Sequence, residues 1–115
     1  VYQGDEIGIG KVAIPPDRIR DPRELREPGR GLNRDPSRTP MPWEDSPQAG
    51  FTTAAETWLP LNDDWPTRNV AAQERELGSM LHLYRALLAL RRARPALALG
   101  EVRLIEAAEG VLAYE

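Results

Sequence analysis

A helix over Leu77–Arg94 is predicted by apolar residues that recur at intervals of three and four along the chain. This spacing places them on one face, so we expect the stripe to belong to a core. Arginines cluster where the helix dipole is negative, and Pro95 cannot continue the helix. Ser79 and His82 fall on the polar face, and His82 is expected to be an ordinary exposed side chain. The predicted stripe consists of Leu77, Met80, Leu81, Leu83, Tyr84, Leu87, Leu88 and Leu90.

Two short alternating runs follow in residues 100–115 and predict a β-hairpin. Glu109-Gly110 lies between the runs and has the composition of a turn. An isolated hairpin of this length is only marginally stable in water. The alternating apolar positions are Val102 and Leu104 in the first run, and Val111 and Ala113 in the second.

Most of residues 8–75 shows neither the helical spacing of apolar residues nor the alternation typical of strands, and proline and glycine are frequent there. Prolines fix φ and remove backbone donors, so this part is predicted to be stiff loop rather than helix or central strand. Residues 1–8 could be the end of a buried strand that turns at Gly4. Asp5 and Glu6 are adjacent, and adjacent side chains of an extended segment point in opposite directions. The two catalytic carboxylates of a glycosidase face each other across the sugar and lie about 5 Å or more apart. We therefore expect Asp5 and Glu6 to be structural.

Composition excludes several classes of site. The chain has 115 residues, a net charge of −3, no cysteine and one histidine. An acidic balance argues against a nucleic-acid partner, and the Cys and His counts leave no disulfide framework and little room for a metal site. We therefore expect neither a metal nor a cofactor. No apolar run is long enough to span a bilayer and the N-terminus lacks a signal-peptide pattern, which predicts a cytoplasmic protein without a membrane partner.

The amount of loop is unusual for a compact domain. The sequence also begins partway through one predicted element, at Val1-Tyr2, and stops partway through another, at Ala113-Tyr114-Glu115. We therefore expect this chain to be a fragment of a larger protein. Self-association with other copies, or exchange of elements between them, is one way in which such a fragment could hold together.

Residues 33–51 carry the candidate chemistry on a proline-stiffened loop, which is where binding sites tend to lie. This stretch and its surroundings resemble the α-glucosidase and oligo-1,6-glucosidase branch of the α-amylase family, glycoside hydrolase family 13. Pro42 departs from the family, in which many members carry Gln. The matching residues are Arg34-Asp35, Arg38-Thr39-Pro40-Met41, Trp43, Ala49-Gly50-Phe51 and Trp58-Leu59-Pro60, with further matches at Asp21-Pro22, Asn69-Val70, Gln73, Ser79, Tyr84-Arg85, Leu87, Leu90 and Arg91.

The resemblance implies an α/β fold, namely a fragment of a (β/α)8 TIM barrel. Residues 1–95 would form its last βα unit, with the end of strand 8, a long active-site loop and helix 8. Residues 96–115 would be the truncated start of a C-terminal antiparallel β domain. Residues 10–32 would follow strand 8, on the face where barrel loops build active sites. This loop is shorter than in oligo-1,6-glucosidases, which favours a maltase-type enzyme.

The family implies a retaining α-glucosidase acting on short oligosaccharides such as maltose or isomaltose. Its Asp nucleophile and Glu acid/base would lie upstream of this chain, so no catalytic residue is expected in the fragment. The first arginine of the family motif reaches the glucose at the cleavage subsite, and it corresponds to Arg34. A guanidinium offers several donors in a rigid plane, which suits sugar hydroxyls. The alternative is a surface ion pair with Asp35 or Glu44.

Other residues of this stretch are expected to have supporting roles. Asp35 and Arg38 are expected to brace the loop. Trp43 and Phe51 would either form a subsite wall or anchor the loop to the barrel, and we favour anchoring.

Two other functions stay open. One is a relative that transfers or isomerises glucosyl units, such as a trehalose synthase or a sucrose-acting enzyme. The other is a non-enzymatic barrel protein such as a transporter heavy chain, against which the presence of Arg34 counts.

Overall fold

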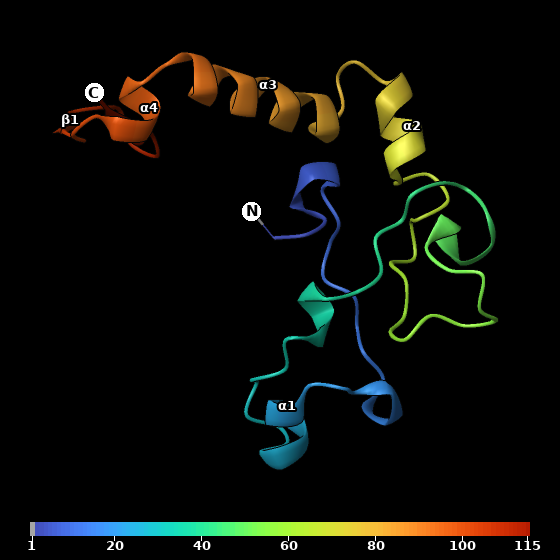
Figure 1. Cartoon of the computed structure of the whole chain (residues 1–115). Helices are drawn as coiled ribbons and strands as arrows, with labels where there is room; N and C mark the ends of the chain where they lie inside the picture. Colours follow the sequence, from blue (N-terminus) through green and yellow to red (C-terminus); the bar gives the residue numbers. More distant parts are fainter. Residues whose placement is uncertain (1) are drawn as a thin grey trace. The chain divides into compact units, whose positions relative to one another are not determined.

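The computed structural model describes residues 2–115; Val1, where the predicted strand would begin, lies outside them. The chain divides into two compact units, one ending at Tyr84 and one running from Arg85 to Glu115. The helices and strands are α1 (Pro22–Arg26), α2 (Val70–Arg75), α3 (Met80–Ala93), α4 (Ala96–Leu99), β1 (Leu104–Ile105) and β2 (Ala113–Tyr114), as drawn in Figure 1. Single 3-10 turns occur at Asp5–Ile7, Pro16–Arg18, Asp35–Ser37 and Pro47–Gly50.

The opening segment is a turn, and the strand end predicted there is wrong for the described residues. The backbone turns at Gly4, whose φ is +96°. The Asp5 carboxylate accepts a hydrogen bond from the Tyr2 N–H, and the Glu6 carboxylate accepts one from the Gly4 N–H, both at 2.9 Å. These local contacts satisfy backbone groups that a strand would offer to a neighbour. The structural role predicted for the two carboxylates is confirmed.

A small apolar core joins distant segments of the first unit. Ile7, Met41 and Leu81 form its buried centre, and Ile9 and Val70 pack against it. The proline-rich loop therefore contributes to the core rather than lying wholly on the surface.

Gln73 of α2 fastens the opening segment to the start of α3. Its Nε2 donates to the Ile7 carbonyl at 2.7 Å, and its Oε1 accepts from the Leu81 N–H at 3.1 Å. The Gln73 carbonyl accepts a hydrogen bond of 2.9 Å from the Ser79 hydroxyl. All of these groups are buried, so one side chain satisfies backbone groups of two other segments.

Helix α3 ends close to the predicted position but begins later, at Met80. The Ser79 N–H donates to the Glu76 carbonyl at 3.0 Å, which makes residues 76–79 a turn and leaves Leu77 85% exposed. Ser79 is buried just before the helix, so its assignment to a polar, outward face is wrong. His82 is half-buried rather than exposed, and its Nε2 lies 3.2 Å from the Glu74 carbonyl oxygen.

The apolar stripe of α3 is mostly exposed in this chain, so its assignment to a core is correct only for Leu81, which is 7% exposed. The core of the first unit reaches only the first turn of the helix. No helix within residues 2–115 is both long and apolar enough to cross a bilayer. The stripe residues that keep between 39% and 51% of their surface exposed are Met80, Leu83, Leu87, Leu88 and Leu90.

The predicted hairpin is confirmed in the second unit. β1 and β2 pair antiparallel, with Leu104 opposite Tyr114. Arg103 and Glu115 extend the ladder through two backbone hydrogen bonds of 2.9 and 3.0 Å, and their side chains form an ion pair. The turn between the strands uses Gly110 at φ +78°, a conformation that favours glycine.

Replacing Asn69 with alanine is expected to lower the free energy of unfolding by roughly 2–4 kcal/mol. Asn69 is 1% exposed and caps α2 by accepting from the Ala72 N–H at 2.8 Å. Its amide also donates to the carbonyls of Trp65 and Pro66, and both would lose their donor. Urea denaturation measures the loss. Asn69→Ser keeps a capping oxygen and should lose less; an equal loss in both variants would contradict the capping role.

Candidate functional site

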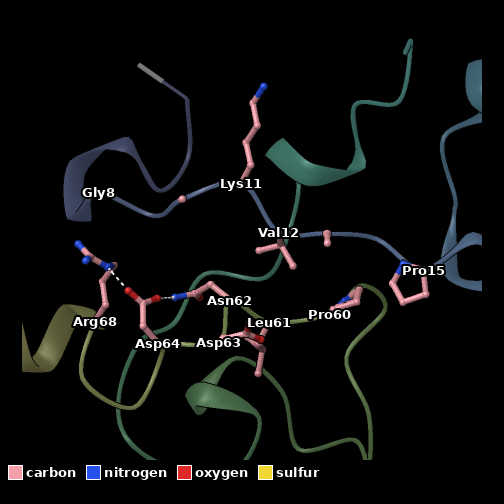
Figure 2. A pocket seen from close by; sticks show the side chains of 12 residues that line it. Gly8, Lys11, Val12, Pro15, Pro60, Leu61, Asn62, Asp63, Asp64 and Arg68 are labelled. Carbon is pink, nitrogen blue, oxygen red and sulfur yellow. Dashed lines mark hydrogen bonds and ion pairs between the residues drawn. The ribbon is translucent and has the colours of Figure 1, made fainter. Parts of the chain in front are cut away.

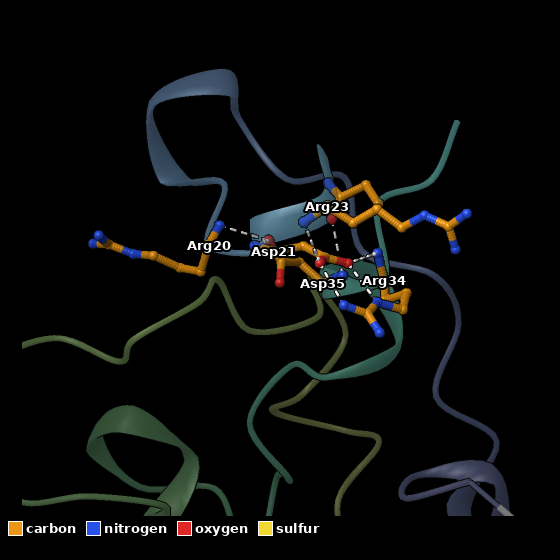
Figure 3. A network of polar contacts seen from close by, with 6 residues as sticks. Arg20, Asp21, Arg23, Arg34 and Asp35 are labelled. Atoms are coloured by element: carbon orange, nitrogen blue, oxygen red, sulfur yellow. Dashed lines mark hydrogen bonds and ion pairs between the residues drawn. The ribbon is translucent and has the colours of Figure 1, made fainter. Parts of the chain in front are cut away.

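Arg34 is held by the carboxylate of Asp21 (Figure 3). Its Nε donates to Asp21 Oδ2 and its Nη2 donates to Asp21 Oδ1, both at 2.7 Å, while its backbone N–H donates to Oδ2 at 2.8 Å. The alternative considered for Arg34, an ion pair with Asp35 or Glu44, is therefore wrong as to the partner. Asp35 accepts from backbone groups, and Glu44 accepts from the Ser46 hydroxyl.

Asp21 is positioned by the start of α1, a short helix that the sequence reading missed. Its carboxylate caps α1 by accepting from the Arg23 N–H at 3.0 Å, and Pro22 occupies the first helical position. The hydrogen bond from the Arg34 guanidinium holds the pKa of Asp21 well below its usual range, and the same contact raises the pKa of Arg34. Both groups are therefore charged at neutral pH.

Asp35 braces this arrangement through hydrogen bonds to the backbone, as predicted. Its Oδ2 accepts from the Arg20 N–H at 2.7 Å and from the Asp21 N–H at 2.9 Å. The side chain of Asn33 in turn accepts from the Asp35 N–H at 2.9 Å. The bracing predicted for Arg38 is wrong, because its exposed side chain makes no hydrogen bond or ion pair with the described residues.

The free donors of Arg34 face outward. Its side chain is 52% exposed, whereas that of Asp21 is 0% exposed. Asp21 occupies Nε and one hydrogen of Nη2, so both hydrogens of Nη1 and the second hydrogen of Nη2 remain for a ligand. Such donors can bind neutral hydroxyl oxygens or a carboxylate.

Trp43 and Phe51 lie on the same loop and are 50% and 40% exposed. The Trp43 backbone is fixed on both sides, since its N–H donates to Ala49 at 2.8 Å and its carbonyl accepts from Ala71 at 2.9 Å. Neither side chain takes part in the hydrogen bonds of Arg34. Gln48 and Ala49 between them adopt a φ of +55°, an unusual conformation for residues other than glycine that no sequence signal indicated.

A second feature is an open groove of about 520 Å³ (Figure 2). The hydrogen-bonded ion pair with Arg68 lowers the pKa of the Asp64 carboxyl, and a hydrogen bond from Asn62 lowers it further. The Asn62 Oδ1 is buried without a hydrogen-bond partner in the described structure. Since Asp64 and Arg68 neutralise each other, the groove is a weaker candidate than the Arg34 site. Its lining consists of Gly8, Gly10, Lys11, Val12, Ala13, Pro15, Pro60, Leu61, Asn62, Asp63, Asp64 and Arg68.

The part of the chain that the structure describes contains no group of three or more His, Asp or Glu side chains suited to a metal ion. The hydrogen bonds of Arg34 and Asp35 make the Arg34 site a hydrogen-bonding site on a braced loop. Sequence reasoning identified Arg34 and Asp35 but missed the role of Asp21, although an Asp before a Pro is a helix-start signal.

Comparison with known proteins matches residues 1–100 to the family model of the alpha amylase catalytic domain. A probable alpha-glucosidase of Rhizobium meliloti (strain 1021) is 38% identical over 114 residues, which cover 99% of this chain and 20% of that protein. The crystal structure of XgtA, an alpha-glucosyl transfer enzyme, is 37% identical with a TM-score of 0.88, covering 99% of this chain and 21% of that one.

A third relative is the amino acid transporter heavy chain SLC3A1 of Rattus norvegicus, 41% identical over 86 residues. These residues cover 75% of this chain and 11% of the transporter heavy chain. Curated relatives such as the Rhizobium protein match this chain over nearly its whole length, but the chain spans only about a fifth of the length of each of them.

Proposed function

Because this chain belongs to the alpha-amylase family of glycoside hydrolases, in the branch that contains the alpha-glucosidases, we propose that it is part of a retaining α-glucosidase that hydrolyses short oligosaccharides of the maltose or isomaltose type. The chain is a piece of the TIM barrel of this family with a small antiparallel sheet. We assign residues 1–95 to the last βα unit and residues 96–115 to the start of the C-terminal β domain. The cytoplasmic location remains a prediction.

The observation that carries the proposal is the set of outward donors on Arg34. Pyranose hydroxyls accept hydrogen bonds, and a guanidinium fixed by a buried carboxylate presents its donors in a constant plane. In a barrel, loops that follow the strands build the active-site face. Arg34 therefore binds the sugar at the cleavage subsite, while Trp43 and Phe51 either line a subsite or anchor the loop.

The catalytic carboxylates are supplied by other parts of the full-length enzyme. Asp21 and Asp35 are each 1% exposed and committed to hydrogen bonds within the loop, so neither can attack an anomeric carbon. A retaining glycosidase needs two carboxyl groups about 5–5.5 Å apart with the sugar between them. This chain by itself is therefore expected to be inactive.

A glucosyl-transferring or isomerising enzyme is the second candidate, supported by the likeness to XgtA at a TM-score of 0.88. A non-enzymatic barrel is supported by the likeness to the transporter heavy chain. The Arg34 site argues against the non-enzymatic reading, because a protein without a sugar subsite needs no such exposed donors.

Product analysis of the full-length protein separates these functions. With maltose as the substrate, we expect glucose to be released with its α-configuration retained, as followed by NMR. Predominant formation of longer or rearranged saccharides from maltose or sucrose would favour the second candidate. Absence of turnover on maltose, isomaltose and sucrose by a correctly folded protein would overturn the enzyme proposal.

A further inference from the structure

Asp21 and Arg34 differ sharply in burial although they form one ion pair. The Asp21 side chain is 0% exposed and the Arg34 side chain is 52% exposed. An ion pair with both partners in water contributes little, because both side chains must be ordered. Here the Asp21 carboxylate is already ordered, because the Arg23 N–H donates a hydrogen bond to it. The backbone N–H of Asp21 also donates to the Asp35 carboxylate. The arginine therefore binds to a fixed anchor.

The contacts of this anchor define the orientation of the guanidinium. Two parallel hydrogen bonds of 2.7 Å from Nε and Nη2 fix its plane, which a single contact would leave free to rotate. A third hydrogen bond, from the Arg34 backbone N–H to the same carboxylate, fixes the start of the side chain. An arginine without such contacts has considerable rotamer freedom.

We propose that Asp21 is a positioning residue for substrate binding, which holds the free donors of Arg34 toward the glucose. This inference rests on the proposed sugar contact of Arg34. Asp21 does not touch the sugar, because Arg34 occupies both of its carboxylate oxygens and its side chain is buried. Its effect on the reaction passes entirely through Arg34.

The decisive experiment is a double-mutant cycle on the full-length enzyme with maltose. Asp21→Asn keeps the size of the side chain but replaces one acceptor oxygen with a donor facing Nη2. We expect kcat/KM to fall by roughly 10- to 100-fold. In an Arg34→Ala background, the same change should lower kcat/KM by less than about twofold, because the group that Asp21 positions is gone.

The matched control is Glu27→Gln. Glu27 pairs with Arg30 at 2.6 Å in the same loop, but the Glu27 side chain is 48% exposed and that of Arg30 is 69% exposed. This carboxylate-to-amide change should leave kcat/KM within about twofold of the parent enzyme. If Asp21→Asn does not fold, Arg34→Lys provides the second variant, since lysine keeps a positive charge beside Asp21 but cannot bind both of its oxygens in one plane. The same fall in kcat/KM is expected.

The outcomes separate this inference from the function on which it rests. If Arg34→Ala has no effect on kcat/KM, the proposed sugar contact fails. If Arg34→Ala lowers kcat/KM but neither Asp21→Asn nor Arg34→Lys does, positioning by Asp21 is overturned. An equal effect of Asp21→Asn with and without Arg34 would show that Asp21 only supports the fold, and would also overturn the inference.

Discussion

Replacing Arg34 with alanine is expected to lower kcat/KM of the full-length enzyme for maltose by roughly 100-fold. Asp21 leaves Nη1 and part of Nη2 free, and under the proposed function these donors bind the substrate. Hydrogen bonds from a charged donor are the stronger ones. The change also leaves the buried Asp21 carboxylate without its cation. Initial rates over a range of maltose concentrations give kcat and KM separately.

Arg30→Ala is the matched control for this experiment. Arg30 lies in the same loop, and its side chain is 69% exposed in an ion pair with Glu27. It should retain kcat/KM within about twofold, since surface pairs of this kind contribute little. If the Arg34 variant behaved like the Arg30 variant, the assignment of Arg34 to the sugar subsite would be wrong. Circular dichroism of both variants distinguishes lost binding from lost folding.

Replacing Gln73 with leucine is expected to lower the free energy of unfolding by roughly 3–5 kcal/mol. Leucine is similar in volume but leaves the Ile7 carbonyl and the Leu81 N–H without a partner inside the first unit. Each buried polar group left without a hydrogen bond costs about 1–3 kcal/mol. The urea midpoint should fall while the slope of the transition stays constant, which identifies a change in stability.

Gln3→Leu is the control for Gln73→Leu, because Gln3 is exposed in the opening segment. It is expected to change the free energy of unfolding by less than about 0.5 kcal/mol. A similarly small effect at Gln73 would show that water replaces the lost contacts, and that the opening segment is not held through this side chain.

The elements that were predictable are those with a strong local signal. The hairpin combined alternation with a Glu109-Gly110 turn, and its pairing is as expected. The helical period located α3 but not its first residue, because the turn at Ser79 is made by hydrogen bonds that leave no trace in the apolar pattern. The exposure of the stripe could not be predicted either, since a period says which face is apolar but not what covers it.

The candidate site was predictable only in part. The family resemblance identified Arg34, and Asp35 next to it was correctly expected to brace the loop. The partner of Arg34 was missed because it lies 13 residues away, and ion-pair reasoning considered residues closer in the sequence. Gln73 was noted only as a match to the family pattern, since its partner Ile7 is 66 residues distant. Contacts at such separations depend on the assembled fold.

The ion pair between Asp21 and Arg34 also has an evolutionary consequence. It closes the segment between them much as a crosslink would, so changes within the segment need not reach the arginine. Gly29 and Gly31 at its tip have positive φ, and no heavy atom outside the glycine and its two chain neighbours lies within 4 Å of the position of an added Cβ at either residue. Insertions at this tip would lengthen the segment, while its two ends stay in place because Asp21 and Arg34 hold them together. Natural variation in the length of this segment could therefore change the surroundings of the site without loss of Arg34, the residue proposed to bind the sugar.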